Sequence, residues 1–127
     1  MDFELATSRS GLNMFFKEWQ ITILNYLWSV QPNGTTSSMV WNHLKNSMSE
    51  PMSRASVINF LKNMTERGVL RENVESGKGG FHGVYYLNFS ESEFKQQIVE
   101  LFVRKLMEEY PEETKKAVIG VRLHNKA

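Results

Sequence analysis

The chain has 127 residues, 41% of them hydrophobic and 12% aromatic, which is enough apolar material for one folded domain with a short appended element. It contains no cysteine, which excludes disulfide bonds, thiolate metal sites and cysteine nucleophiles. The formal net charge of +1 excludes little, because a nucleic-acid-binding protein needs local rather than overall positive charge.

The N-terminal sequence lacks the charged and apolar regions of a secretory signal, and no apolar run reaches the roughly 18 residues of a membrane span. We therefore expect a cytoplasmic protein without a membrane partner. Residues 1–15 are expected to form a flexible N-terminal segment.

Two amphipathic helices are predicted at the start of the folded region. Apolar side chains three and four residues apart predict a first helix over residues 15–30, which the sequence Gln-Pro-Asn-Gly then ends. Thr35 and Thr36 are candidate N-caps for a second helix of about three turns that extends to residue 48. The inward-facing side chains are Trp19, Ile23, Leu24, Leu27 and Trp28 in the first helix and Val40, Trp41 and Leu44 in the second.

A third helix is predicted between Ser53, a good N-cap, and Gly68, a typical C-terminal glycine. Its apolar side chains have spacings of three, four and seven residues and should face inward: Val57, Phe60, Leu61 and Met64. The side chains left on the outward face are Ala55, Ser56, Ile58, Asn59, Lys62, Asn63 and Glu66.

The sequence period changes after the third helix, from Val69 onward. The runs VLRENV and GVYYLNF are rich in β-branched and aromatic residues and predict two strands. The connecting segment ESGKGGFHG contains four glycines, so we expect a two-stranded ribbon with a flexible, partly basic tip. The sequence does not decide whether Phe81 packs on the core or lies exposed on this ribbon.

A fourth helix is predicted over residues 90–110, because Ser90 and Glu93 form a capping-box pattern and Pro111 follows. Its apolar stripe is longer than a small three-helix core needs: Phe94, Ile98, Leu101, Phe102 and Leu106. We expect this stripe to contact a second copy of the chain, to fold back onto its own domain, or both. Residues 111–127 are expected to be a tail with a weak apolar cluster.

Charge is distributed unevenly along the chain. Residues 53–83 carry five Lys or Arg and three Glu, whereas residues 91–113 carry seven Glu and three Lys or Arg. This division is expected if the middle of the chain meets phosphate groups and the last helix has another role. Ordinary scatter of surface charge is the alternative explanation.

The order helix, helix, helix, ribbon, helix is that of a winged helix-turn-helix: a mainly α fold in which residues 16–89 form a three-helix core and a two-stranded wing. The stretches ILNYLWSVQP, TSSMVWNHL, SRASVINFLKNMTERGVLRE and GVYYLN then resemble the penicillinase-repressor family over about residues 16–88. The resemblance implies a transcriptional repressor that binds double-stranded DNA as a homodimer, with its dimerisation region beginning at the fourth helix. Ala55 and Ile58 occupy positions that are often basic in that family.

The second helix of a helix-turn-helix enters the major groove, and its N-terminal residues reach base edges. The expected DNA-binding residues of this recognition helix are Ser53, Arg54, Ala55, Ser56, Ile58, Asn59, Lys62 and Asn63. Arg54, Ser56 and Asn59 are the candidates for base edges. Lys62 and Asn63, one turn further along, are expected nearer the DNA backbone. On the wing, Lys78 and His82 are expected at phosphates or in a minor groove. A solvated helix face and a plain flexible hairpin are the alternatives.

No motif indicates an enzyme, a cofactor or a metal site. The three histidines lie in different predicted elements, without acids or thiolates at ligand spacing, and no nucleophile elbow or phosphate-binding loop is present. The sequence therefore predicts a DNA-binding regulator. A winged-helix module that binds proteins rather than DNA, and a regulator that responds to a small molecule, remain open alternatives.

Overall fold

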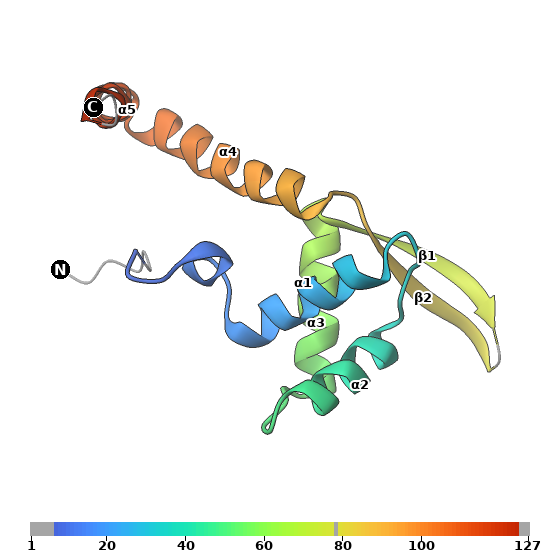
Figure 1. Cartoon of the computed structure of the whole chain (residues 1–127). Helices are drawn as coiled ribbons and strands as arrows, with labels where there is room; N and C mark the ends of the chain where they lie inside the picture. The colour runs from blue at the N-terminus through green and yellow to red at the C-terminus, as the bar shows by residue number, and fades with distance from the viewer. Residues whose placement is uncertain (1–6, 78, 125–127) are drawn as a thin grey trace. The chain divides into compact units, whose positions relative to one another are not determined.

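A computed structural model of the chain describes residues 7–77 and 79–124. Their secondary structure elements, in chain order (Figure 1), are the 3-10 helix η1 (Gly11–Met14), α1 (Glu18–Val30), α2 (Ser37–Ser47), α3 (Arg54–Glu66), β1 (Leu70–Gly77), β2 (Gly80–Leu87), α4 (Glu91–Glu109) and α5 (Pro111–His124). The chain divides into two compact units, Met1–Ser90 and Glu91–Ala127. Among the described residues, no helix has both the length and the apolar character that a membrane span requires.

The first unit is a winged helix, as predicted. Helix α2 packs against α1 and α3, and the base of the ribbon contacts both α1 and α3. All four side chains predicted to face inward from α3 are buried. The other buried apolar side chains of this unit are Ile23, Leu24, Leu27, Val40, Leu44, Leu70, Tyr85 and Leu87.

The three tryptophans lie at the edge of this core rather than inside it, because each indole is only partly buried. The Trp28 Nε1 atom donates a hydrogen bond to the Phe89 carbonyl at 3.3 Å, and the Trp41 Nε1 atom donates to the Met52 carbonyl at 3.2 Å. An indole has one polar atom that must find a partner when its ring is buried, which favours positions at a core boundary.

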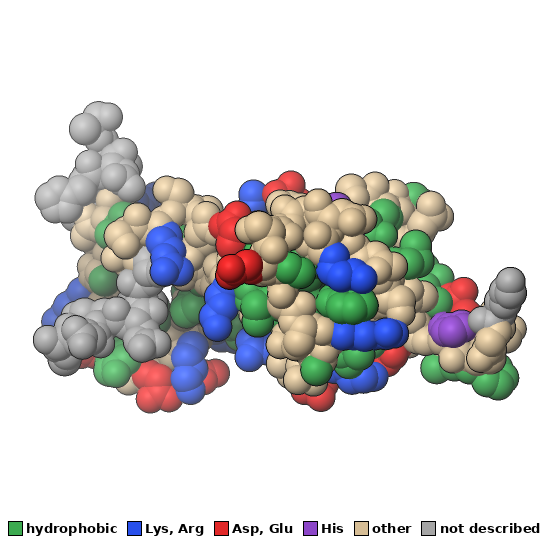
Figure 2. All heavy atoms as spheres, turned by 90° about the horizontal axis from the view of Figure 1, so that it is seen from below, with side chains coloured by type: hydrophobic (Ala, Val, Ile, Leu, Met, Phe, Trp, Pro, Cys, Tyr) green, Lys and Arg blue, Asp and Glu red, His purple; other side chains and the backbone are tan. Residues whose placement is uncertain are grey.

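Figure 2 views the molecule from the α2 side and shows hydrophobic and basic side chains next to one another there.

Side-chain caps begin α2 and α3 where the sequence predicted them. The Thr36 hydroxyl accepts a hydrogen bond from the Met39 amide, and the Ser53 hydroxyl accepts one from the Ser56 amide, both at 3.2 Å. Gly68 follows α3 with a φ of 79°, a left-handed conformation that suits glycine.

Thr35, the other candidate cap, instead pairs with the ribbon. Its amide donates to the Tyr85 carbonyl at 3.0 Å, and its carbonyl accepts from the Tyr85 amide at 2.8 Å. Gly34 passes so close to the ribbon at this point that a Cβ atom there would lie only 2.5 Å from Val84 Cγ1. The bridge fixes the α1–α2 connection to β2, a contact that the sequence analysis missed.

The ribbon is longer than predicted, and the expectation of a loop over the glycine-rich segment was wrong. Antiparallel pairing runs from Leu70 opposite Leu87 to Gly77 opposite Gly80. Only positions 78 and 79 connect the strands, and residue 78 lies outside the described residues. Gly79 and Gly80 have φ angles of 92° and 116°, so the glycines supply the tight turn rather than a long flexible tip.

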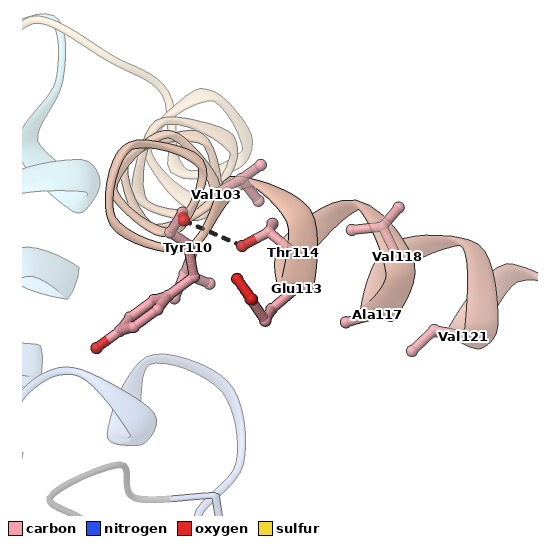
Figure 3. Close-up of a pocket in the computed structure, with 8 residues that line it drawn as sticks. Val103, Tyr110, Glu113, Thr114, Ala117, Val118 and Val121 are labelled. Atoms are coloured by element: carbon pink, nitrogen blue, oxygen red, sulfur yellow. Dashed lines mark hydrogen bonds between the residues drawn. The ribbon is translucent and has the colours of Figure 1, made fainter.

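The second unit consists of α4 and α5, of which only α4 was predicted. Pro111 was interpreted as the end of α4, but it also begins α5, where its fixed φ and missing amide hydrogen are well tolerated. The first turn of α5 contains Glu112 and Glu113, which interact favourably with the helix dipole. The Thr114 hydroxyl donates to the Leu106 carbonyl at 3.0 Å and joins the two helices (Figure 3). The predicted tail is therefore a helix over residues 111–124.

The N-terminal segment also contains structure that the sequence analysis did not predict. Residues 11–14 form η1, which contacts α1. Next to it, the rings of Phe16 and Trp19 meet the Phe60 ring edge to face, with centroids 6.3 and 5.6 Å away. The segment around Phe16 thus covers one end of the α3 core.

We predict that Leu61→Ala lowers the free energy of unfolding by about 2–5 kcal/mol, because Leu61 is fully buried and its loss leaves a cavity under α3. Denaturant unfolding followed by circular dichroism measures this change. The control is Asn63→Ala on the exposed face, which should shift stability by less than about 0.5 kcal/mol. Equal midpoints for the two variants would contradict the assignment of Leu61 to the core.

Candidate nucleic-acid interface

The outward face of α3 presents the residues that the sequence predicted for DNA binding. Ser56 and Ile58 are partly buried, and the remaining members of the predicted set are exposed: Ser53, Arg54, Ala55, Asn59, Lys62 and Asn63. Because the opposite face of the helix is buried, these side chains stand on a rigid support. The side-chain amide of Asn59 forms no hydrogen bond with any described residue and is therefore available to a ligand.

The first turn of α3 is held by hydrogen bonds that restrict its polar side chains. The hydroxyls of Ser53 and Ser56 lie 3.0 Å apart. The Arg54 Nη2 atom donates to the Ser38 hydroxyl of α2 at 2.7 Å, so the guanidinium lies across the helix-turn-helix toward α2. The sequence analysis did not assign Ser38 a role, because Ser38 and Arg54 are sixteen positions apart in the sequence and only the fold brings them together.

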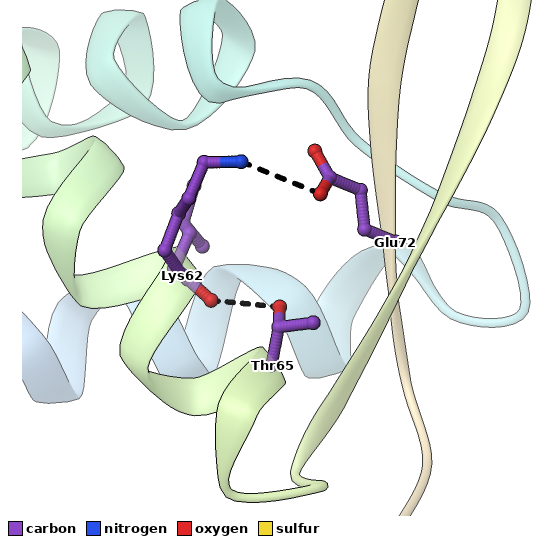
Figure 4. Close-up of polar contacts among 4 residues, drawn as sticks. Lys62, Thr65 and Glu72 are labelled. Carbon is purple, nitrogen blue, oxygen red and sulfur yellow. Dashed lines mark hydrogen bonds and ion pairs between the residues drawn. The ribbon is translucent and has the colours of Figure 1, made fainter.

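Lys62 lies between α3 and the wing. Its Nζ atom is 3.4 Å from Glu72 Oε1 on β1 (Figure 4). Both side chains remain partly exposed, so the ion pair contributes less than about 1 kcal/mol. The pair therefore orients Lys62 while leaving the ammonium group accessible to a competing phosphate.

Glu72 also accepts a hydrogen bond from the hydroxyl of Tyr85 on β2. Burial of the phenol and this hydrogen bond raise the pKa of Tyr85 to about 12. Glu72 thus contacts Tyr85 at the base of the wing and Lys62 on α3, and so links the two elements. Neither Glu72 nor Tyr85 was predicted to belong to the site, since only strand register brings them together.

The opposite face of the ribbon carries a second acid–tyrosine pair. The Tyr86 hydroxyl donates to Glu75 Oε2 at 2.6 Å, and this hydrogen bond raises the pKa of Tyr86. The Arg71 guanidinium lies 4.8 Å from the centre of the Tyr86 ring. These contacts stiffen the wing on the face that points away from Glu72.

The outer part of the wing is exposed. Phe81 has 78% of its surface exposed and does not pack on the core, which answers the question that the sequence left open. His82 is also exposed and stands opposite Glu75 in the ribbon. Lys78, the other wing residue predicted to contact DNA, lies outside the described residues.

The second unit exposes apolar side chains along both helices. Of the predicted dimer contacts, Leu101, Phe102 and Leu106 are 56%, 42% and 45% exposed, whereas Phe94 is buried and Ile98 partly buried within the single chain. An apolar groove of about 440 Å³ lies between α4 and α5 (Figure 3). Its lining residues are Val103, Leu106, Tyr110, Glu113, Thr114, Ala117, Val118 and Val121.

Within the described residues, no group of three His, Cys, Asp or Glu side chains is placed to hold a metal ion. His43 instead stacks on the Tyr26 ring, with centroids 4.4 Å apart, and its ring lies within hydrogen-bond distance of the Ser47 hydroxyl. The packing of His43 is that of a structural side chain.

Fold and site together define a winged helix-turn-helix with a second, helical unit. Residues 17–120 match the model of the penicillinase repressor family, so the chain belongs to that family, and the resemblance noted in the sequence is confirmed. The match includes α4 and most of α5. Membership makes the protein a transcriptional regulator, in a family of regulators rather than enzymes. No curated protein sequence matches the chain.

Solved structures share this fold. A possible transcriptional regulator from Methanosarcina mazei Go1 is 16% identical and superposes with a TM-score of 0.55 over 76% of this chain and 78% of its own. A PadR family transcription regulator from Clostridium difficile R20291 is 14% identical, with a TM-score of 0.52 over 74% and 98%. A putative transcriptional regulator from Thermoplasma acidophilum is 18% identical, with a TM-score of 0.50 over 71% and 89%. At these identities the likeness shows the fold alone.

We predict that ionisation of Tyr85 destabilises the protein at alkaline pH. The pKa of Tyr85 is raised in the folded state, so its contribution to stability is complete below pH 10, where an unfolded tyrosine also keeps its proton, and falls as pH rises from about 10 to 12. Unfolding free energies measured across this range should fall more steeply for the wild type than for Tyr85→Phe. Parallel curves would contradict the prediction.

Proposed function

We propose that the protein is a sequence-specific repressor that binds a two-fold DNA operator as a homodimer, with α3 in the major groove. The observation that carries the proposal is the division of α3 into a buried face and an outward polar face with an available amide at Asn59. A recognition helix needs both, because the core must hold it while its outward side chains meet base edges.

Side chains on α3 are suited to different parts of the duplex. The Asn59 amide can form two hydrogen bonds with an adenine edge, and the apolar side chains of Ala55 and Ile58 can contact thymine methyl groups. Lys62 and Asn63 lie one turn further along the helix, where the DNA backbone is expected. His82 on the wing completes the proposed contacts with phosphate or the minor groove.

The apolar surface of α4 supports dimerisation. Leu101 and Phe102 are about half exposed, and Leu106 lines the groove between α4 and α5. Clusters of exposed apolar side chains on this scale mark interaction surfaces, and a two-fold DNA site requires a two-fold protein. Occupying such a site across a promoter would block transcription.

We predict that the purified protein binds random duplex DNA at low ionic strength and loses affinity steeply as salt rises. Each neutralised phosphate contributes about 0.9 to the slope of log affinity against log salt concentration. Fluorescence anisotropy of a labelled duplex over a salt series measures the slope. Binding that is absent at every salt concentration would reject the proposal and favour a module that binds proteins.

The same assay separates base reading from backbone binding once a high-affinity duplex has been selected from a random pool. Asn59→Ala should weaken binding to the selected duplex by about 1–3 kcal/mol and change binding to random DNA little. Asn63→Ala, one turn away, is the matched control and should affect both duplexes alike. If Asn59→Ala lowers both affinities equally, Asn59 does not read bases.

We predict that Leu101→Glu dissociates the dimer, because a charge placed at an apolar interface loses its hydration. Analytical ultracentrifugation of the variant should show a monomer where the wild type sediments as a dimer. Gln97→Glu introduces the same charge at an exposed polar position of α4 and should leave the dimer intact. A dimeric Leu101→Glu variant would place the interface elsewhere.

A further inference from the structure

Two cationic side chains converge on Trp41 at the junction of α2 and α3. The Lys45 Nζ atom lies 3.7 Å from the centre of the Trp41 ring, and the Arg54 Cζ atom lies 5.9 Å from it. Lys45 comes from the last turn of α2, and Arg54 is the first residue of α3. We call Trp41, Lys45 and Arg54 the basic–aromatic cluster.

Each member of the cluster is held in position by the fold. The Trp41 Nε1 hydrogen bond to the Met52 carbonyl fixes the ring against the connection between α2 and α3. The Ser38 hydroxyl holds the Arg54 guanidinium at 2.7 Å. Trp41 is partly buried, whereas Lys45 and Arg54 are exposed. The ring is therefore a fixed platform, and the two cations lie at the surface above it.

Among the residues that the structure describes, the cations of the cluster have no acidic partner. Neither Lys45 nor Arg54 forms an ion pair with a carboxylate of the described residues. By contrast, Lys62, further along α3, pairs with Glu72. Two like charges close to one ring repel each other, and the attraction of both to a nearby anion offsets this repulsion. This arrangement favours a bound anion between or beside them.

We propose that the basic–aromatic cluster binds a phosphate of the DNA backbone, with Lys45 and Arg54 as phosphate contacts and Trp41 as the residue that positions them. The inference rests on the proposed DNA-binding function and deepens it. The first helix of a helix-turn-helix crosses the DNA backbone while the second enters the groove, so a phosphate is the expected neighbour of the α2–α3 junction. Arg54 is thereby reassigned from base edges to the backbone.

Stacking on Trp41 gives these cations an advantage over mobile surface lysines. A long basic side chain loses rotamer freedom when it grips a phosphate, and a side chain already restrained by an aromatic ring loses less. An exposed cation–π contact is worth about 0.5–1 kcal/mol, which corresponds to about a two- to fivefold change in affinity. Loss of the ring should therefore weaken binding without changing which sequence is preferred.

The experiment measures binding of the full chain to the selected duplex and to a scrambled duplex over a salt series. Lys45→Gln should reduce the slope of log affinity against log salt by about one and weaken both duplexes by the same factor. Arg67→Gln is the matched control, because it removes one exposed positive charge from the far end of α3. This control should leave the slope unchanged.

Variants of Trp41 test the positioning role. Trp41→Leu should weaken both duplexes about two- to fivefold, and Trp41→Phe, which retains an aromatic ring, should recover part of that loss. Thermal unfolding confirms that each variant is folded at the assay temperature. Ser38→Ala, which removes only the hydroxyl that holds Arg54, provides the same test without touching the ring and should also weaken both duplexes equally.

The outcomes separate this inference from the proposed function. If the wild type binds neither duplex, the proposed function fails and the cluster inference fails with it. If the wild type binds with a steep salt dependence but Lys45→Gln, Trp41→Leu and Ser38→Ala behave like Arg67→Gln, only the cluster inference is overturned. A loss confined to the selected duplex would show that the cluster reads bases, which also overturns its assignment to phosphate.

Discussion

The burial of the inner face of α3 is the constraint on which the remaining structure depends. Val57 and Leu61 are fully buried, and Phe60 and Met64 nearly so. Four apolar side chains on one side of a 13-residue helix fix its orientation, because rotation of the helix about its axis would expose them to water. The outward side chains are therefore presented in a fixed direction, and the side-chain amide of Asn59 forms no hydrogen bond with another described residue.

The wing is positioned by contacts that start from the same core. Tyr85 is buried at the base of β2, where its backbone pairs with Thr35 and its hydroxyl bonds to Glu72. Glu72 in turn meets Lys62 on α3. The ribbon therefore contacts α1, α2 and α3 and pairs with the connection between α1 and α2, whereas Val74 and Phe81 are largely exposed.

The parts of this structure that were predicted from sequence are those set by local physics. Helix caps at Thr36 and Ser53 and the periodicity of α3 depend on residues within one or two turns of each other. The missed features depend on distant partners or on ambiguous local signals. The Thr35 bridge and the Arg54–Ser38 hydrogen bond join separate elements, and Pro111 suits a helix start as well as a helix end.

The arrangement at α2 and α3 separates affinity from specificity. In the proposed complex the basic–aromatic cluster binds the DNA backbone, which is common to every duplex. Asn59 instead contacts a base edge, which differs from one DNA sequence to another. Ala55 and Ile58 lie on the face of α3 that is proposed to meet the groove, and neither side chain can donate a hydrogen bond to guanine. Under this proposal the chain binds the backbone of any duplex, while the side chains proposed to face the groove favour contacts with adenine and thymine.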